Sequence, residues 1–257
     1  MAMCALCVKD PNLKNSHLIP KSAYKTIGKS KRQSKSPILV RSLRNIAAPS
    51  DFQYAKMLLC GKCEQLFSSR EDLVSKYWCR GSGFLLKNQL RQMKPDDFDE
   101  GRRFYSPYPP VGLKESDLYY FALSLAWRAC QGSWGEFEGI KVFTQSLELE
   151  VKEYLLGRAG PPPQIKVMVY VDWDGKLGQM LTLPHVDSGR MQIVLLGLCI
   201  EIHIDVEGQD IIVQSLNAMG QNVSLVLDKT RCAEVYELIV KEAMRLKFLK
   251  PGAWYST

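Results

Sequence analysis

Apolar residues in the second half of the chain follow two different spacings, which predict helices and then strands. They recur at helical spacing over Glu115 to Cys130 and over Phe137 to Leu156. After the proline run from Pro161 to Pro163, short segments rich in Val, Ile and Leu are separated by Asp-Gly and Ser-Gly turn signals, which predicts antiparallel strands. These segments are Ile165 to Asp172, Gln179 to Leu183, Met191 to Ile204 and Ile211 to Leu216.

A last amphipathic helix is predicted over Thr230 to Phe248, with Asp228 as its cap. This half of the chain should therefore be α+β, with an antiparallel sheet packed by helices. Glu201, His203 and Asp205 alternate with apolar residues and share one face of a predicted strand. We expect that face to be exposed or to form an interface.

The first half is less regularly patterned. A weakly amphipathic helix is expected over Glu71 to Leu90, interrupted at Gly81 and Gly83. The region from Lys94 to Gly112 is charged and then rich in proline, which is typical of a domain boundary. We therefore expect a module over 1–90, a linker over 91–112 and an α+β domain over 113–257, which would sense, oligomerise or bind a partner.

The composition is that of an ordinary globular protein. The 257 residues are 46% hydrophobic and 24% charged, which excludes disordered, collagenous and coiled-coil classes. The apolar runs are far shorter than the roughly 18 residues that a membrane-spanning helix needs. The first residues also lack the basic and apolar regions of a signal peptide. We therefore expect a cytoplasmic protein without a membrane partner.

Positive charge is concentrated near the N-terminus. Residues 1–90 carry 16 Lys and Arg against 5 Asp and Glu, and the stretch from Pro11 to Ser50 has no acidic residue. Such a block favours a polyanionic partner, since Lys and Arg neutralise phosphates and release counterions. Tyr24 is the only aromatic residue in the stretch, which favours contact with a duplex backbone over base stacking. The candidate nucleic-acid-binding residues are Lys21, Lys25, Lys31, Arg32 and Lys35.

Two Cys-x-x-Cys pairs carry the strongest chemical signal. Cys4 and Cys7 form the first pair, and Cys60 and Cys63 the second. Two such pairs supply the four thiolates of a closed tetrahedral Zn²⁺ site, which is normally structural. Free thiols or a redox pair are the alternatives. The remaining cysteines are isolated and should be small buried apolar side chains.

Between the pairs lies Ser16-His17-Leu18-Ile19-Pro20, and the second pair is followed directly by Glu64. With the two Cys pairs, these motifs make residues 1 to 80 resemble a zinc-stabilised HNH-type nuclease module of the treble-clef, ββα-metal kind. The resemblance is to a bacterial subgroup with a Ser-His-x-Ile-Pro motif and a Cys-Glu pair. Less specifically, the segment from Ser124 to Arg128 is similar to that group's C-terminal region.

The resemblance implies metal-dependent hydrolysis of phosphodiester bonds in DNA, as in bacterial defence or a mobile element. It implies His17 as general base and Glu64 as a ligand of a catalytic Mg²⁺ or Mn²⁺ ion. The alternatives are a structural role for His17, such as a hydrogen bond to a backbone carbonyl, and a solvated or helix N-terminal charge for Glu64. Ser16 occupies the position where the family usually has Asp or His. A hydroxyl is a poorer ligand for these hard cations than a carboxylate.

Two other functions fit the sequence. One is a catalytically inactive, zinc-stabilised protein that binds nucleic acid, which agrees with Ser16 and with the single histidine near the cysteines. The other is an adaptor whose zinc module is a scaffold for protein interactions, with a protein partner or a second copy held through the C-terminal domain. The adaptor should not bind DNA at physiological salt concentration, whereas the other two should.

Overall fold

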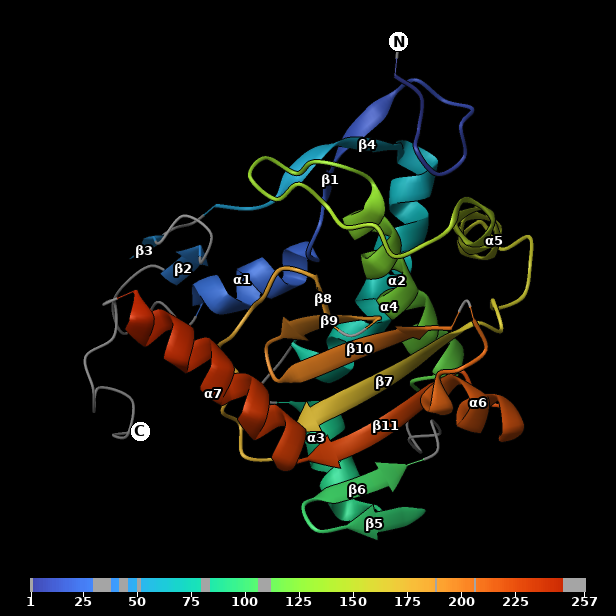
Figure 1. Cartoon of the computed structure of the whole chain (residues 1–257). Coiled ribbons are helices and arrows are strands. Elements are labelled where there is room, and N and C mark those ends of the chain that lie inside the picture. Colours follow the sequence, from blue (N-terminus) through green and yellow to red (C-terminus); the bar gives the residue numbers. More distant parts are fainter. Residues whose placement is uncertain are drawn as a thin grey trace.

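A mixed sheet forms the centre of the structure, with helices on both faces (Figure 1). The computed structural model describes residues 2–29, 38–41, 46–49, 52–79, 84–105, 112–187, 189–205 and 207–246. Among these, seven strands form the sheet in the order β5-β6-β11-β7-β10-β9-β8. They are β5 (Asp97–Asp99), β6 (Arg102–Tyr105), β7 (Ile165–Asp172), β8 (His185–Asp187), β9 (Arg190–Leu195), β10 (Leu198–Ile204) and β11 (Val223–Asp228).

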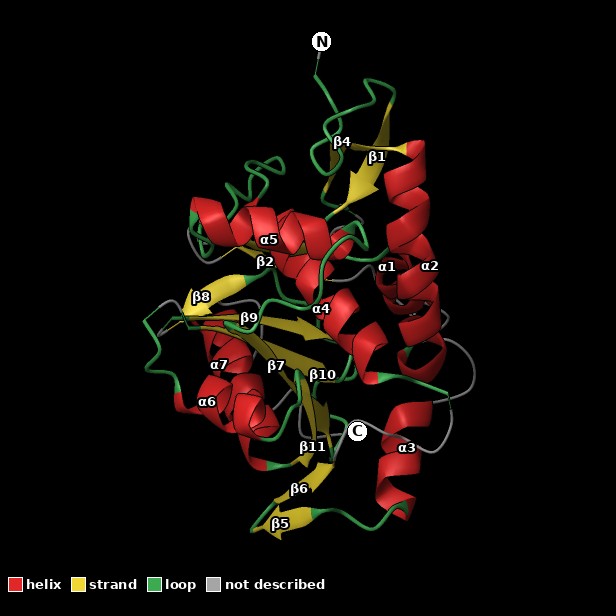
Figure 2. Cartoon of the chain, turned by 90° about the vertical axis from the view of Figure 1, so that its right-hand side faces the viewer, coloured by secondary structure: helices red, strands yellow, loops and turns green. Residues whose placement is uncertain are grey.

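The central strands are apolar on both faces because helices cover both sides. On β7, Val167, Val169 and Val171 join the main hydrophobic cluster, whereas Met168 and Tyr170 contact smaller clusters on the other face. Continuous apolar runs are typical of strands buried on both sides. Figure 2 shows α6 (Ile211–Ala218) and α7 (Thr230–Arg245) on one side of the sheet and α4 (Glu115–Cys130) on the other.

The prediction of an α+β half with helices packed on a sheet is confirmed, but the sheet is mixed rather than antiparallel. β10 pairs antiparallel with β7 and β9, while β11 pairs parallel with β7, with Val223 opposite Val167. β10 returns the chain antiparallel to β7, and α6 then carries it from β10 past β7 to β11, which runs in the same direction as β7. The parallel neighbours β7 and β11 are thus joined through β8, β9, β10 and α6 rather than by the direct turn of a hairpin.

Four predicted elements of the second half differ in the structure. The segment Met191 to Ile204 is a hairpin of two strands, β9 and β10, rather than one strand. Residues 211–216 were expected to be a strand but form α6, because the Asp210 side chain accepts hydrogen bonds from the N–H groups of Ile212 and Val213 and caps a helix. Residues 179–183 contain only an isolated bridge at Leu181. Helix α5 (Gln145–Leu155) begins eight residues later than expected, at a Thr144 cap. The last helix, α7, is confirmed from Thr230 to Arg245.

The N-terminal part is built on a two-stranded antiparallel pair and a long helix. β1 (Leu13–His17) pairs with β4 (Ala55–Cys60), and α2 (Gly61–Trp78) follows β4 directly. The single helix expected over Glu71 to Leu90 is therefore replaced by α2, which begins earlier, and by α3 (Leu85–Gln92). The other elements of this part are α1 (Lys21–Lys29), β2 (Ile38–Arg41) and β3 (Ile46–Pro49).

Buried side chains of both halves form one continuous hydrophobic cluster. It includes Phe67 and Trp78 of α2, Trp127 of α4, and Ile200 of β10. The Trp78 indole N–H donates to the carbonyl of Leu195 on β9 at 2.7 Å. Residues 91–112, expected as a linker, contain β5 and β6, which extend the sheet beside β11. Within the described part of the chain, no helix has the length and apolar character to cross a membrane.

Candidate functional site

The four cysteines of the two Cys-x-x-Cys pairs converge at one end of the β1–β4 pair. Cys4 and Cys7 flank a turn ahead of β1, Cys60 is the last residue of β4, and Cys63 lies in the first turn of α2. Their sulfur atoms all lie within 4.8 Å of one another. The Ala5 N–H donates to the Leu58 carbonyl at 3.1 Å, which fixes the turn against β4. The predicted convergence is confirmed, and the cluster could hold a metal ion such as zinc.

The surroundings of the Cys4 sulfur fit the thiolate that a metal ligand must be. Burial raises the pKa of Cys4, but backbone N–H groups of Cys7, Cys60 and Leu6 hydrogen-bond to its sulfur, and the result is a pKa of about 7. Such N–H groups stabilise the anionic form of the thiol. Burial instead raises the pKa of Cys60 and Cys63, so the lowered pKa is confined to Cys4 among these three. Cys4, Cys60 and Cys63 are buried, so a metal bound here would be largely shielded from water, which is typical of a structural site.

The register of β1 against β4 brings Ser16 to the start of α2. Ser16 lies opposite Lys56, and the register shifts between Lys14 and Asn15. The buried Ser16 hydroxyl donates to Glu64 Oε2 at 2.7 Å and accepts from the Leu59 N–H at 3.3 Å. Glu64 therefore belongs to the same cluster of side chains as the Ser-His motif, rather than to a solvated helix surface.

His17 is the last residue of β1 and lies opposite Ala55. Desolvation lowers the pKa of its imidazole, and the positive charge of Lys21 lowers it further, whereas a hydrogen bond with Gln53 and the charge of Glu64 act in the opposite direction. The imidazole is therefore neutral at pH 7 and can accept a proton. Tyr24 of α1 lies beside it, with ring centroids 6.3 Å apart.

Arg128 of α4 holds the backbone of His17 in place. The guanidinium Nη1 donates to the His17 carbonyl at 2.8 Å, and Nη2 pairs with the carboxylate of Glu71 on α2. Both Arg128 and Glu71 are largely shielded from solvent. Sequence reasoning did not assign Arg128 a role at the site, although the resemblance included its segment. A lone arginine at the end of an apolar helix is the signal that could have identified it.

Two of the five predicted nucleic-acid-binding residues lie in the described structure. Lys21 and Lys25 are exposed on α1, the helix that follows the Ser-His-Leu-Ile-Pro segment. Lys31, Arg32 and Lys35 lie outside the described residues. Lys21 acts electrostatically on His17, so α1 places positive charge beside the imidazole.

The residues around His17 do not form a second group of metal ligands comparable with the cysteines. In the described part of the chain, the four cysteines are the one group of three or more His, Cys, Asp or Glu side chains close enough to share an ion. Glu64 supplies a single carboxylate near His17, and one of its oxygens accepts the Ser16 hydrogen bond. Divalent Mg²⁺ and Mn²⁺ prefer several oxygen ligands. We therefore derive no catalytic step through such an ion.

Away from this cluster, the face of β10 that was expected to be exposed or to form an interface is covered by helices of the same chain. His203 is 4% exposed and Glu201 1% exposed, because α6 and α7 pack over this side of the sheet. His203 Nδ1 lies 2.9 Å from the Asp210 carboxylate, and Glu201 pairs with Arg231 of α7 at 2.7 Å. These residues form a buried polar network within the fold.

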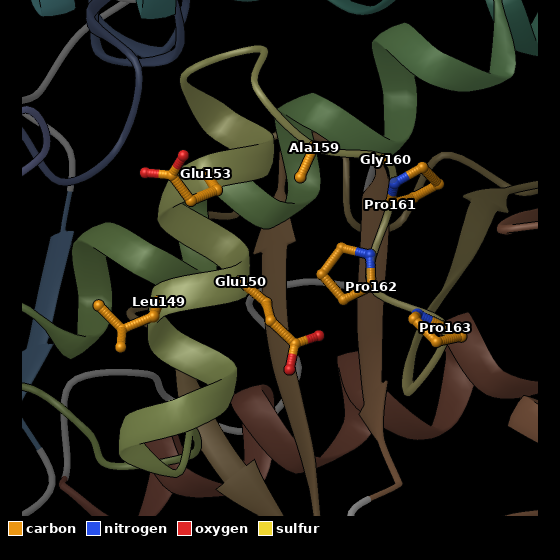
Figure 3. Close-up of a pocket in the computed structure, with 8 residues that line it drawn as sticks. All are labelled: Leu149, Glu150, Glu153, Ala159, Gly160, Pro161, Pro162 and Pro163. Atoms are coloured by element: carbon orange, nitrogen blue, oxygen red, sulfur yellow. The ribbon is translucent and has the colours of Figure 1, made fainter.

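An apolar pocket opens between α5 and the proline run (Figure 3). Its lining residues are Leu149, Glu150, Glu153, Ala159, Gly160, Pro161, Pro162 and Pro163. Glu150 and Glu153 are the charged members. None of the lining residues belongs to β1, β4 or α2, so the pocket is not part of the cluster around His17.

Comparisons of the chain with protein-family models, with curated proteins and with solved structures give no match. The cysteine cluster and the neighbouring Ser16, His17 and Glu64 are therefore interpreted from their own geometry and chemistry.

Proposed function

We propose that the protein is an HNH-like endonuclease that hydrolyses phosphodiester bonds of DNA. The observation that carries this proposal is that β1, β4 and α2 form one ββα unit that holds the cysteine cluster, His17 and Glu64. A treble-clef module with Zn²⁺ bound by Cys4, Cys7, Cys60 and Cys63 would have this arrangement. The zinc would fix the end of the β1–β4 pair and the start of α2.

In this proposal, the neutral imidazole of His17 accepts a proton from a water molecule as its oxygen attacks the phosphorus atom. The phosphorus–oxygen bond to the leaving sugar then breaks, and solvent protonates the leaving oxygen. Arg128 positions His17 through its carbonyl, and Gln53 orients the ring. Lys21 and Lys25, both on α1, would contact the phosphates of the DNA backbone.

The resemblance also implies a divalent cation, for which Glu64 is the available carboxylate. When bound, Mg²⁺ or Mn²⁺ would stabilise the negative charge that develops on the phosphate. The cytoplasmic location and a role in bacterial defence or a mobile element belong to the same proposal.

A plasmid-nicking assay with Mn²⁺ or Mg²⁺ tests the enzyme. We expect the wild-type protein to nick DNA and His17→Ala to lose this activity, with unchanged zinc content and circular dichroism. His185→Ala is the matched control, since His185 is exposed on β8 in a different part of the fold. It should cleave like the wild type. Equal nicking by His17→Ala and wild type would contradict the role of His17.

The second candidate function is a zinc-stabilised module that binds nucleic acid without cleaving it. The hydrogen bond between Ser16 and Glu64 favours this candidate, because it uses one of the two oxygens of the single carboxylate near His17. This candidate predicts a salt-dependent electrophoretic shift of DNA with no nicking under any metal condition. Absence of both the shift and the nicking would favour the adaptor, which binds a protein partner or a second copy.

A further inference from the structure

Three cationic side chains from different elements converge on the indole ring of Trp173, which follows β7. The Arg103 guanidinium of β6 lies 4.5 Å from the ring centroid, and the Lys229 ammonium, just before α7, lies 4.8 Å from it. The Arg91 guanidinium of α3 lies 5.8 Å from the same centroid. We refer to Arg91, Arg103, Lys229 and Trp173 as the Trp173 cluster.

The two arginines hydrogen-bond to neutral acceptors, which fix the positions of the guanidinium groups without cancelling their charge. Arg91 Nη2 donates to the Trp173 carbonyl at 2.5 Å. Arg103 hydrogen-bonds to the hydroxyl of Tyr105, which in turn donates to the Leu90 carbonyl at 2.6 Å. Within the described residues, none of the three cations of the cluster forms an ion pair with a carboxylate.

The carboxylates that the structure describes near the cluster form no ion pair with its three cations. Asp99 pairs with Arg102 at 2.5 Å. Asp172 accepts backbone hydrogen bonds from Asp174 and Leu177, and Asp228 accepts one from Cys232. Asp172 and Asp228 are buried at the ends of β7 and β11, whereas Arg91 and Lys229 are exposed. Asp174, next to Trp173, is also exposed, and the exposed charges of Arg91 and Lys229 outweigh its single negative charge, so the outward-facing charge is positive.

We propose that the Trp173 cluster binds phosphate groups of a nucleic acid strand, as a contact separate from α1 and the cysteine module. Two arginines held by neighbouring backbone and phenol groups present forked donors that match phosphate oxygens, and Lys229 adds a flexible point charge. The cations come from three elements and two of them are exposed, an arrangement that fits an extended sugar–phosphate backbone. The inference shares its class of ligand with the proposed function but rests on different residues.

Binding of a short labelled DNA duplex to the full-length, zinc-loaded protein tests the proposal. The assay uses fluorescence anisotropy over a salt series without Mg²⁺ or Mn²⁺, so that cleavage cannot interfere. The triple variant R91Q/R103Q/K229Q should lower the slope of log affinity against log salt by about 2 to 3. Its affinity at about 150 mM salt should fall roughly 10- to 100-fold.

The control variant K141Q/R158Q/K241Q removes the same total charge at exposed positions outside the cluster. We expect its slope to stay near the wild-type value. Equal slopes for the two triple variants, or no duplex binding by the wild type, would overturn the proposal. Lys229→Gln alone provides a second test in case the triple variant folds poorly, because Lys229 is exposed, and its slope should fall by about 1.

Tryptophan fluorescence gives a readout at the cluster itself. Addition of duplex should change the emission of the wild-type protein, and Trp173→Phe should lose most of that change. A response to inorganic pyrophosphate but not to duplex would overturn the assignment to nucleic acid. The result is independent of the nicking assay, since DNA binding through this cluster requires no cleavage by His17.

Discussion

The cysteine module and the central sheet are held together by different interactions. The β1–β4 pair has only two strands, and a two-stranded pair is at best marginally stable in water. Its free end is fixed by four cysteine side chains within 4.8 Å of one another. The sheet instead has central strands covered on both faces by helices. A metal would therefore stabilise the cysteine module, whereas apolar burial stabilises the sheet.

The two regions are nevertheless joined through α2 and α4. Phe67 and Trp78 of α2 belong to the same hydrophobic cluster as the sheet. Arg128 at the end of α4 reaches the His17 carbonyl and the Glu71 carboxylate. The position of His17 therefore depends on the cysteine cluster at one end of β1 and on the helical layer at the other.

Loss of the proposed zinc should have the largest effect on stability. Structural zinc in small peptides contributes an apparent binding free energy of about 10–16 kcal/mol. Cys60→Ser should lose stoichiometric zinc, and hydrogen exchange should then speed up at the β1 and β4 amides while β7 and β10 stay protected. Cys130→Ser is the control, because Cys130 lies on α4 outside the cluster and should not affect zinc content. Equal loss of protection in both regions would contradict the inference that zinc stabilises the cysteine module and not the sheet.

The second largest effect should come from the link between the regions. Arg128→Met removes one partner of a largely buried ion pair and leaves the Glu71 carboxylate uncompensated. Such changes cost about 3–5 kcal/mol. Urea unfolding should show this loss. Arg158→Met breaks an exposed pair with Glu153 and should cost about 0–1 kcal/mol. Similar losses in the two variants would show that Arg128 does not join the regions.

Local motifs could be predicted from the sequence, whereas contacts that depend on strand register or helix packing could not. The Cys-x-x-Cys pairs are local motifs with a fixed chemical requirement, so their convergence could be predicted without a fold. The hydrogen bond between Ser16 and Glu64 could not, because it depends on the register of β1 against β4, including the shift between Lys14 and Asn15. The contact of Arg128 with His17 joins residues 111 positions apart and depends on the packing of α4.

The sheet region shows the limit of apolar pattern alone. Strands β7, β9 and β10 were predictable from their runs of Val, Ile and Leu. The segment Ile211–Ala218 has a similar composition but is a helix, because Asp210 caps it and its buried residues Val213 and Leu216 are three apart. This helix carries the chain from β10 past β7 to β11, so the place of β11 beside β7 and the order of the sheet could not be predicted without it.

A smaller effect is expected in the pH dependence of DNA cleavage, which reports the pKa of His17 beside the cysteine module. Desolvation and Lys21 lower the pKa of His17 below its ordinary value of 6.5. The base is active when neutral, so log kcat/KM should rise with pH by about one unit per pH unit below the pKa and level off above it. The midpoint should lie below 6.5. A midpoint above that value would contradict a desolvated His17 as the base.

The smallest predicted effect comes from Lys21, which acts on His17 through its charge alone. Lys21→Gln removes a charge that disfavours the imidazolium, so the midpoint of the pH profile should move upward by a few tenths of a unit, because near-surface charges interact weakly. Lys25→Gln, one turn further along α1, is the matched control and should move it less. Both variants should weaken DNA binding to a similar extent if both lysines contact phosphates. Equal shifts of the midpoint in the two variants would show that the net charge of α1, rather than the closeness of Lys21 to His17, lowers the pKa of His17.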